Sequence, residues 1–364
     1  GNHPIGHLLS TFFEHHGHER HEVFLYATHI FQTDVSGYGT RLQKAADHFR
    51  DCRSLSDLDF AKLIRNDHLH ILIDLDGYMH GGRPEMLATR VAPIQIHWLQ
   101  SLAGCPAPYF DYTIVDRVIV PDEERDQGNG PLIRLADAFQ CGERFALPDE
   151  RPSRARWGLP EKGFVFCVFG NWLKIDAPVF DAWMEILKAV PESVLWLTSG
   201  PTPQSLATLR RAAVQQGVDG DRLIVAERTD DKLTHLDRHR CADLYLDTFT
   251  FSAATSATDA LSAGLPVLTK KGSTAQSRLS ESLIRAAGPT ALIVNDRETY
   301  IKTAIRLAHH PKDLAKHVSA LNDALPEARL FDPQRMVKQF ELIYDHVIAT
   351  ARSGEKPAHY DVVL

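Results

Sequence analysis

The stretch that decides the fold is Leu69-His70-Ile71-Leu72-Ile73-Asp74-Leu75, a nearly continuous apolar run. Runs of this kind are typical of parallel strands that are buried on both faces. The run ends at Asp74-Leu75-Asp76, where the chemistry of a strand-end turn is expected. A parallel sheet needs helical crossovers, so the rest of the chain should alternate between short apolar runs and amphipathic helices.

The chain shows this alternation on both sides of a polar stretch at residues 122–156, which is the expected interdomain linker. Strands are expected at residues 21–26, 69–75, 93–99, 112–115, 118–120, 164–169, 193–197, 223–225, 242–247 and 266–269. Helices are expected at residues 40–49, 181–189, 203–216, 255–263, 296–321 and 333–352. Two such series predict two Rossmann-like domains with doubly wound parallel sheets that face a cleft. The expected segments are residues 1–150, residues 151–340, and a C-terminal helix and tail at residues 341–364.

The composition narrows the function classes. The 364 residues carry 40 Lys and Arg against 47 Asp and Glu, a formal net charge of −7. A nucleic-acid binder that relies on bulk positive charge is therefore not expected. No apolar run is long enough to span a membrane, and no signal peptide is evident. The five cysteines form no CxxC pair, which predicts thiols in a reducing compartment and favours the cytoplasm.

Several catalytic signatures are absent from the sequence. It has neither the glycine fingerprint of a dinucleotide-binding domain nor a P-loop, and it has no GxSxG serine elbow. His3 and His7 have the spacing of one helix face, but Pro4 lies between them and no third ligand is evident, so no metal site is expected. Asp74 and Asp76 match the DxD of metal-dependent sugar transferases, although a turn remains the favoured interpretation.

Two groups of basic side chains suit an anionic ligand. Lys174 follows the strand expected at residues 164–169, where its ammonium would face the end of the sheet. Lys232, His235 and Arg238 are spaced along one helix face and would offer donors in one direction. The alternative in each case is a solvated basic edge with no ligand.

The helix expected from Thr255 completes this set. Small and hydroxyl residues precede and open it, so its first backbone N–H groups would be available to a phosphate. Asp259, one turn later, would suit a ribose hydroxyl, whereas the simpler alternative is ordinary N-capping by Thr255 or Ser256. Because all three elements follow expected strands, together they predict a nucleotide-sugar site.

The order of several segments resembles the catalytic region of protein O-GlcNAc transferases, glycosyltransferase family 41, which have the GT-B fold. The matching segments are Gly1-Asn2-His3-Pro4, His7-Leu8, and residues 70–78, 92–99, 111–112, 173–176, 193–197, 246–248 and 259–264. This resemblance covers nearly the whole chain. It implies inverting transfer of GlcNAc from UDP-GlcNAc to Ser or Thr hydroxyls of proteins, without a metal ion or cofactor. The implied partners are the UDP-sugar donor, protein acceptors and a tetratricopeptide-repeat segment that precedes this chain.

The resemblance also implies residue roles in the donor site. Lys174 matches the lysine that binds the diphosphate and supports the leaving group, and Asn171 lies beside the phosphates. Thr255 and Ser256 match the pair that caps the diphosphate. The nucleoside is implied to be held by His235 and Arg238 at the uracil, by Lys232 at the ribose or phosphate, and by Asp259 at the ribose.

On the acceptor side, the resemblance implies that His7 lies at the face shared by sugar and acceptor. Asp67 and His70 lie on the loop and strand beside it. Transfer to a hydroxyl needs a base, and His7 and Asp67 are the candidates. The resemblance also implies a strand before the histidine motif, which residues 1–364 do not include.

Two departures from the family pattern leave the donor sugar open. Residues 100–105 replace a glycine-rich turn, and Ala254 replaces a histidine, and both positions lie near the sugar in the family. A related UDP-glucose-dependent transferase that acts on asparagine is therefore an alternative. A UDP-sugar-binding module without catalysis and a UDP-sugar epimerase are the others.

Overall fold

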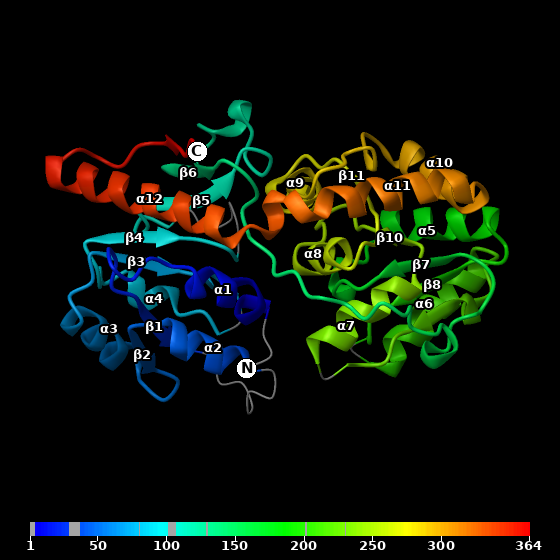
Figure 1. Cartoon of the computed structure of the whole chain (residues 1–364), viewed down its shortest axis with the longest axis horizontal. Coiled ribbons are helices and arrows are strands. Elements are labelled where there is room, and N and C mark those ends of the chain that lie inside the picture. The colour runs from blue at the N-terminus through cyan, green and yellow to red at the C-terminus, as the bar shows by residue number, and fades with distance from the viewer. Residues whose placement is uncertain are drawn as a thin grey trace. The chain divides into compact units, whose positions relative to one another are not determined.

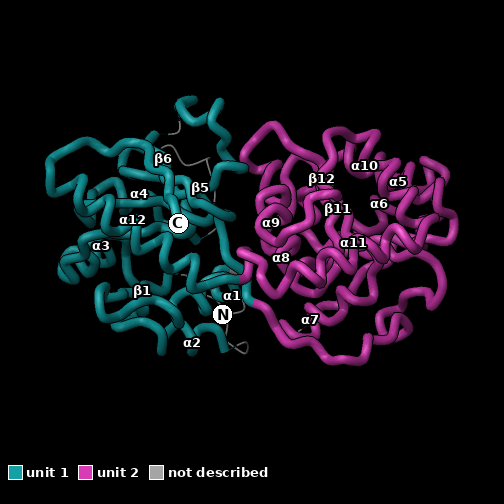
Figure 2. Tube along the Cα trace, turned by 45° about the horizontal axis from the view of Figure 1, so that its top comes forward, with its two compact units in different colours: residues 1–143, 332–364 teal, residues 144–331 magenta. Residues whose placement is uncertain are grey.

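The computed structural model describes residues 4–28, 37–79, 81–100, 107–128, 130–200, 202–229 and 231–364. The chain divides into two compact units, unit 1 (residues 1–143 and 332–364) and unit 2 (residues 144–331), which Figure 2 colours separately. The sequence predicts a division near residue 150 and a separate segment from residue 341. Instead, the C-terminal helix belongs to unit 1, because its Phe340 packs against Phe12 with ring centroids 5.0 Å apart.

Unit 2 is built on a parallel sheet of six described strands. They are β7 (Val165–Val168), β8 (Val194–Leu197), β9 (Leu223–Val225), β10 (Leu244–Leu246), β11 (Val267–Lys270) and β12 (Ile293–Val294). The spatial order is β12-β11-β10-β7-β8-β9, and every pair is parallel. Numbered along the chain, this is the Rossmann order 3-2-1-4-5-6, which places a topological switch point between β7 and β10.

Helices pack around this sheet (Figure 1). They are α5 (Ala177–Ala189), α6 (Pro203–Gln215), α7 (Lys232–Arg238), α8 (Thr255–Ser262), α9 (Leu279–Ala287), α10 (Arg297–His309) and α11 (Pro311–Ala324). Asp176, Thr202 and Asp231 begin α5, α6 and α7, because each side chain accepts a hydrogen bond from a backbone N–H of the first turn. The buried Trp183 of α5 joins α10 through a 3.3 Å hydrogen bond to the Tyr300 hydroxyl.

Unit 1 contains two parallel sheets in the described residues. The larger has the order β13-β6-β5-β4-β3, and the smaller pairs β1 with β2. The strands are β1 (Phe24–Ala27), β2 (His48–Asp51), β3 (Ile71–Asp74), β4 (Ile94–His97), β5 (Tyr112–Asp116), β6 (Leu132–Leu135) and β13 (Tyr360–Asp361). The helices are α1 (Pro4–Glu14), α2 (Tyr38–Ala45), α3 (Asp57–Asn66), α4 (Pro84–Leu87) and α12 (Pro333–Ser353).

The edge strands β1 and β3 both line a cavity of about 790 Å³ inside unit 1. Residues 22–28 and 67–76 contribute from the two sheets, and Phe12 and Tyr344 contribute from α1 and α12. The facing edges of two parallel sheets therefore share one space within this unit.

Short 3₁₀ helices connect many of the elements. They are η1 (Asp122–Glu124), η2 (Ala155–Trp157), η3 (Trp172–Lys174), η4 (Gly220–Arg222), η5 (His239–Cys241), η6 (Ala275–Arg278), η7 (Leu325–Glu327) and η8 (Arg329–Phe331). Of these, η3 matters most for the site described below.

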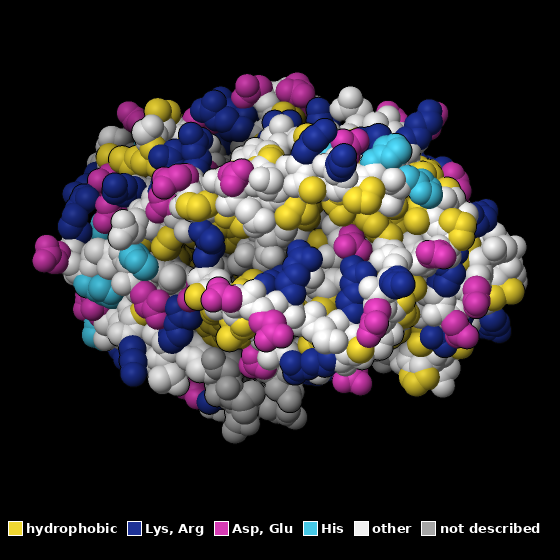
Figure 3. All heavy atoms as spheres, turned by 45° about the vertical axis from the view of Figure 1, so that its right-hand side comes forward, with side chains coloured by type: hydrophobic (Ala, Val, Ile, Leu, Met, Phe, Trp, Pro, Cys, Tyr) yellow, Lys and Arg dark blue, Asp and Glu magenta, His cyan; other side chains and the backbone are white. Residues whose placement is uncertain are grey.

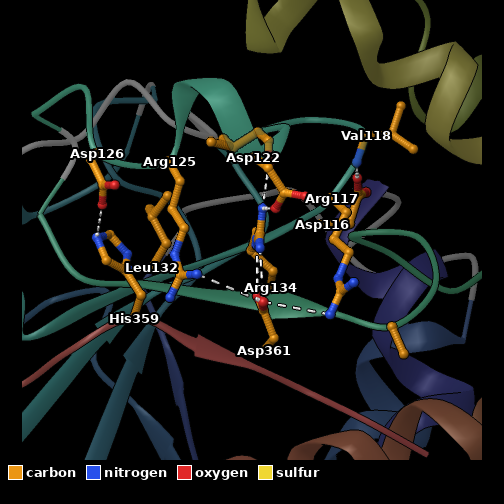
Figure 4. Close-up of polar contacts among 12 residues, drawn as sticks. Asp116, Arg117, Val118, Asp122, Arg125, Asp126, Leu132, Arg134, His359 and Asp361 are labelled. Carbon is orange, nitrogen blue, oxygen red and sulfur yellow. Dashed lines mark hydrogen bonds and ion pairs between the residues drawn. The ribbon is translucent and has the colours of Figure 1, made fainter.

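The C-terminal strand is held by a buried arginine (Figure 4). Arg134 on β6 is 2% exposed and donates two hydrogen bonds to Asp361 on β13, at 2.6 and 2.8 Å. A second carboxylate, Asp122, lies 2.6 Å from the same guanidinium. The paired geometry compensates the desolvation of Arg134 and holds residues 360–361 in the sheet.

Four expectations about individual elements are wrong. The single helix expected at residues 296–321 is two helices, α10 and α11, which are separated at His310 before Pro311. The helix expected to reach Phe49 ends at Ala45, because Ala46 is extended and residues 48–51 pair with β1. The strand expected at residues 118–120 is a turn, because the Asp116 carboxylate accepts the N–H groups of residues 118 and 119 at 2.8 Å each. The expected linker at residues 122–156 contains the buried strand β6, a run of four residues that polar residues flank in the sequence.

Candidate active site

Lys174 lies at the switch point of unit 2. The segment after β7 forms η3, which begins at Asn171, whose side-chain oxygen accepts the Leu173 N–H at 3.0 Å. Lys174 ends η3, and its Nζ donates to the Ser252 carbonyl in the turn after β10, at 2.8 Å. The same ammonium lies 3.9 Å from the centroid of the Phe251 ring. Lys174 therefore bridges the carboxyl ends of the two strands where ligands of such sheets bind.

Burial weakens the hold of Lys174 on its proton. Burial lowers the pKa of this half-buried ammonium to about 8, and the negative charge of Asp247 opposes the shift. A cation of this kind would be stabilised by an anion arriving beside it.

The basic side chains of α7 converge on Asp259 of α8. Lys232 Nζ lies 2.6 Å from one carboxylate oxygen of Asp259, and His235 Nε2 lies 3.2 Å from the other. Burial raises the pKa of Asp259, but Lys232 and His235 outweigh this and keep the pKa well below its usual range. Lys232 and His235 therefore hold Asp259 as an oriented carboxylate, a contact that the sequence analysis did not predict.

Arg238 is the most deeply buried member of the group, at 3% exposed. Its Nη1 donates to the Glu227 carbonyl at 2.6 Å, and its Nη2 donates to His235 Nδ1 at 2.7 Å. The guanidinium also lies over the Phe169 ring, 4.5 Å from its centroid. Because arginine can only donate, His235 carries its proton on Nε2, the atom that faces Asp259.

The first turn of α8 has no side-chain cap. Its N-cap is Ala254, which excludes the alternative of N-capping by Thr255 or Ser256. Thr255 and Ser256 instead form the first turn, and the Tyr245 hydroxyl donates to the Ser256 hydroxyl at 3.1 Å. The uncapped turn leaves backbone N–H groups for an anion, as expected at a helix N-terminus.

The acceptor-side candidates belong to unit 1. His7 lies on α1 and stacks on Tyr38, with ring centroids 4.2 Å apart. Asp67 follows α3 and accepts hydrogen bonds from the Tyr26 hydroxyl at 2.8 Å and from Arg50 at 3.1 Å. The exposed His70 immediately precedes β3. Both Asp67 and His70 therefore line the cavity near the amino end of β3.

The DxD-like pair at the end of β3 is a turn, as predicted. One Asp74 oxygen accepts the Gly77 N–H at 2.8 Å and lies 3.1 Å from His97 Nδ1. Within the described part of the chain, no three His, Cys, Asp or Glu side chains are arranged to hold a metal ion. His3 lies outside the described residues.

The sequence analysis missed three residues of the site. Phe169 and Phe251 support Arg238 and Lys174 through their rings, and Asp247 is buried behind Lys174. Asp247 carries a usable signal, since it is an acidic residue that directly follows an apolar strand. The two phenylalanines carry none, because an aromatic residue beside a strand is usually core.

The surface carries both signs of charge, as the near balance of basic and acidic residues in the sequence predicts. Lys and Arg side chains lie among Asp and Glu side chains on the face drawn in Figure 3. None of the described helices is long and apolar enough to cross a membrane.

Comparison with known proteins identifies the family. The sequence model of glycosyl transferase family 41 matches residues 1–150 and 150–340, so the chain belongs to this family, as the sequence predicts. A probable UDP-N-acetylglucosamine–peptide N-acetylglucosaminyltransferase of Arabidopsis thaliana, SEC, is 33% identical over 370 residues, covering 100% of this chain and 38% of that protein. The Caenorhabditis elegans UDP-N-acetylglucosamine–peptide N-acetylglucosaminyltransferase is 26% identical and covers 97% of this chain and 40% of that protein.

A solved structure shows the same fold. A mutant O-GlcNAc transferase of Thermobaculum terrenum superposes with a TM-score of 0.85 at 28% identity, over 95% of this chain and 65% of that one. This match confirms the GT-B class with its two Rossmann-like units. The chain spans about two fifths of the length of the curated relatives it matches.

Proposed function

We propose that this chain carries out the inverting transfer of GlcNAc from UDP-GlcNAc to Ser or Thr hydroxyls of proteins, without a metal ion. The observation that carries the proposal is Lys174 at the switch point, joined to the turn that leads into the uncapped start of α8. A cation and free N–H groups at this place would stabilise the negative charge that develops on departing UDP. We assign Thr255, Ser256 and Asn171 to the same diphosphate.

The remaining donor residues would hold the nucleoside. We assign the uracil to His235 and Arg238, whose rigid mutual hydrogen bond presents a defined edge to the base. We assign the ribose hydroxyls to Asp259, which Lys232 and His235 keep ionised and hold in one orientation. These side chains come from α7 and α8, the helices that precede and follow β10, and β10 borders the switch point where a Rossmann fold binds a nucleotide.

Transfer also requires removal of the acceptor proton. In the proposed step, the acceptor oxygen attacks the anomeric carbon, the bond to the diphosphate breaks, and UDP leaves with the electron pair. His7 is the first candidate to take the hydroxyl proton. Burial raises the pKa of Asp67, but hydrogen bonds from Arg50 and Tyr26 outweigh this and lower it, which makes Asp67 the weaker base. His70 is assigned to the acceptor face.

A second donor remains a candidate because of one observation. Position 254, directly before the first turn of α8, carries only a methyl group. A smaller side chain beside the sugar would fit UDP-glucose transfer to asparagine as well as UDP-GlcNAc transfer to a hydroxyl. If neither reaction occurs, the site would serve as a UDP-sugar-binding module.

The partners follow from the proposed reaction. They are the UDP-sugar donor, protein acceptors and a preceding tetratricopeptide-repeat segment, with no role for nucleic acid or membrane. The four described cysteines are buried free thiols, which supports a cytoplasmic location.

We also propose that one further parallel strand fills the unit 1 cavity between β1 and β3. The support is the strand order. If the added strand precedes β1 along the chain, it would join β2 and β1 to β3, β4 and β5 in the 3-2-1-4-5-6 order of unit 2, and β6 and β13 would follow as two further strands. Amide hydrogen exchange in β1 and β3 should then be slower in a longer protein that includes this strand than in residues 1–364 alone. Equal exchange in both would contradict the proposal.

The reaction is tested by intact-mass analysis of a mixed protein acceptor incubated with UDP-GlcNAc or UDP-glucose in the presence of EDTA. A gain of one N-acetylhexosamine, lost in Lys174→Met and kept in the exposed-lysine control Lys188→Met, would support the proposal. A hexose gain would favour the asparagine-directed alternative. UDP binding without any gain would leave only the binding module.

A further inference from the structure

Asp247 is a buried carboxylate at the centre of the donor site. It directly follows β10 and is 1% exposed. One of its oxygens accepts the N–H groups of Thr248 and Ala253, each at 2.8 Å. The other accepts the hydroxyl of Thr269 on β11 at 2.6 Å. A single side chain thus closes the turn of residues 248–253 on itself and ties it to the neighbouring strand.

This turn presents both anion-binding features of the site. Its Ser252 carbonyl accepts the Lys174 ammonium, and its end at Ala253 leads directly into α8. The Tyr300 hydroxyl donates to the Asp247 carbonyl at 2.9 Å, and Ser280 donates to the Ala253 carbonyl at 2.8 Å. The backbone of the turn is therefore held from three elements, with the Asp247 carboxylate in the middle.

The charge of Asp247 also acts on Lys174. Burial raises the pKa of Asp247, and the hydrogen bond from Thr269 and the Lys174 charge oppose this shift. Other titratable groups on the elements packed around the turn have partners of their own. Asp176 accepts a hydrogen bond from the Thr250 hydroxyl, and Lys270 lies over the Phe249 ring. Arg278 donates to the Gly272 carbonyl, and Tyr245 donates to the Ser256 hydroxyl. Asp247 is the carboxylate whose field opposes the loss of the Lys174 proton.

We propose that Asp247 is a positioning residue for the transfer reaction. It holds the turn of residues 248–253 in the shape that receives Lys174 and keeps the Lys174 ammonium charged until the diphosphate arrives. This inference rests on the proposed function for its catalytic meaning, but not for its effect on Lys174. An acidic residue is needed because three donors converge on it, and only a carboxylate accepts at both oxygens without contributing a donor.

The test measures the Lys174 proton directly. Lysines are labelled with ¹³C at Cε, the Lys174 signal is assigned by its loss in Lys174→Met, and its titration is followed without ligand. In wild type the midpoint should lie near pH 8. In Asp247→Asn it should fall by about one pH unit, because an opposite charge nearby is removed. Thr269→Val, which removes a hydrogen bond but no charge, should leave the midpoint close to wild type.

Activity provides the second readout. The alkaline limb of kcat/KM should move with the Lys174 midpoint, so Asp247→Asn should be about fivefold slower than wild type at pH 8 from the lower protonated fraction alone. The variant Asp247→Asn/Thr269→Asp, which returns one carboxylate to the same space, should restore the midpoint. This variant also serves if Asp247→Asn does not fold.

The outcomes separate the two proposals. An unchanged Lys174 midpoint in folded Asp247→Asn, or a lowered midpoint in the double variant, would overturn the role of Asp247. If wild type transfers no sugar to any acceptor, the proposed function fails, while the titration still decides whether Asp247 holds the charge of Lys174.

Discussion

Replacing Lys174 by methionine should abolish transfer without unfolding the protein. Methionine has nearly the same length and fills the same space, so no cavity is created. The lost cation is the one that we assign to the developing charge on UDP. Removing one such donor typically costs about 3–4 kcal/mol of transition-state stabilisation, or about 10²–10³ in kcat.

The folded state should lose little stability in this variant. The pKa of Lys174 is about 8 rather than 10.5, so its charge costs up to about 3 kcal/mol of folding free energy, and less because the side chain is only half-buried. The folded-state pKa lies below the unfolded one, so this cost is present below pH 8 and disappears as the pH rises from about 8 to 10.5. Methionine removes that cost but also loses the hydrogen bond to Ser252 and the contact with Phe251, about 2–4 kcal/mol together.

These opposing effects nearly cancel, so Tm should change by less than about 4 °C. The assay pairs calorimetric unfolding with steady-state transfer of N-acetylhexosamine, and Lys188→Met serves as the exposed-lysine control. The expected result is a loss in kcat much larger than the change in UDP affinity, because the interaction strengthens in the transition state. A folded Lys174→Met protein that retains more than a tenth of wild-type kcat would refute this reasoning.

Three further predictions follow from the same contacts. Arg238→Ala should weaken UDP binding by about 10- to 100-fold in calorimetry, since hydrogen bonds from a charged group are lost. Unchanged UDP affinity would show that Arg238 does not bind the uracil. Wild-type kcat/KM should fall as the pH rises through about 8, where free Lys174 loses its proton, and a profile flat to pH 9.5 would show that this proton is not needed. Arg134→Met should lower the urea stability of unit 1 by about 1.5–3 kcal/mol, because Asp361 loses two hydrogen bonds from a charged group and keeps only the longer contacts with Arg117 and Arg125, and a loss under 1 kcal/mol would show that β13 is held by other contacts.

The sequence predicted most elements of unit 2 because their signals are local. Its strands are continuous apolar runs, such as residues 194–197, and its helices begin at side chains that cap them, such as Thr202. Prediction failed where a tertiary partner decided the outcome. Phe49 has helical spacing but belongs to a strand that pairs with β1, and the short strand β6 became recognisable only through the strands beside it.

The candidate site divides in the same way. The spacing of Lys232, His235 and Arg238 on one helix face follows from the helical period, so the sequence predicted that they act together. It could not show that Asp259 lies within 2.6 Å of Lys232, nor that Arg238 orients His235, since those contacts join residues from different elements.

The sequence by itself determined the family, the alternation of strands and helices, and the residue types of a nucleotide-sugar site. These properties follow from the hydrophobic periodicity, from the helix-capping residues and from the order of motifs along the chain. Only the tertiary structure brought Lys174 to the Ser252 carbonyl, 78 positions away along the chain, and buried Asp247 behind both. The physical reason is the sheet order: β7 and β10 are distant in sequence, but they are neighbours across the switch point, so their loops meet at one edge.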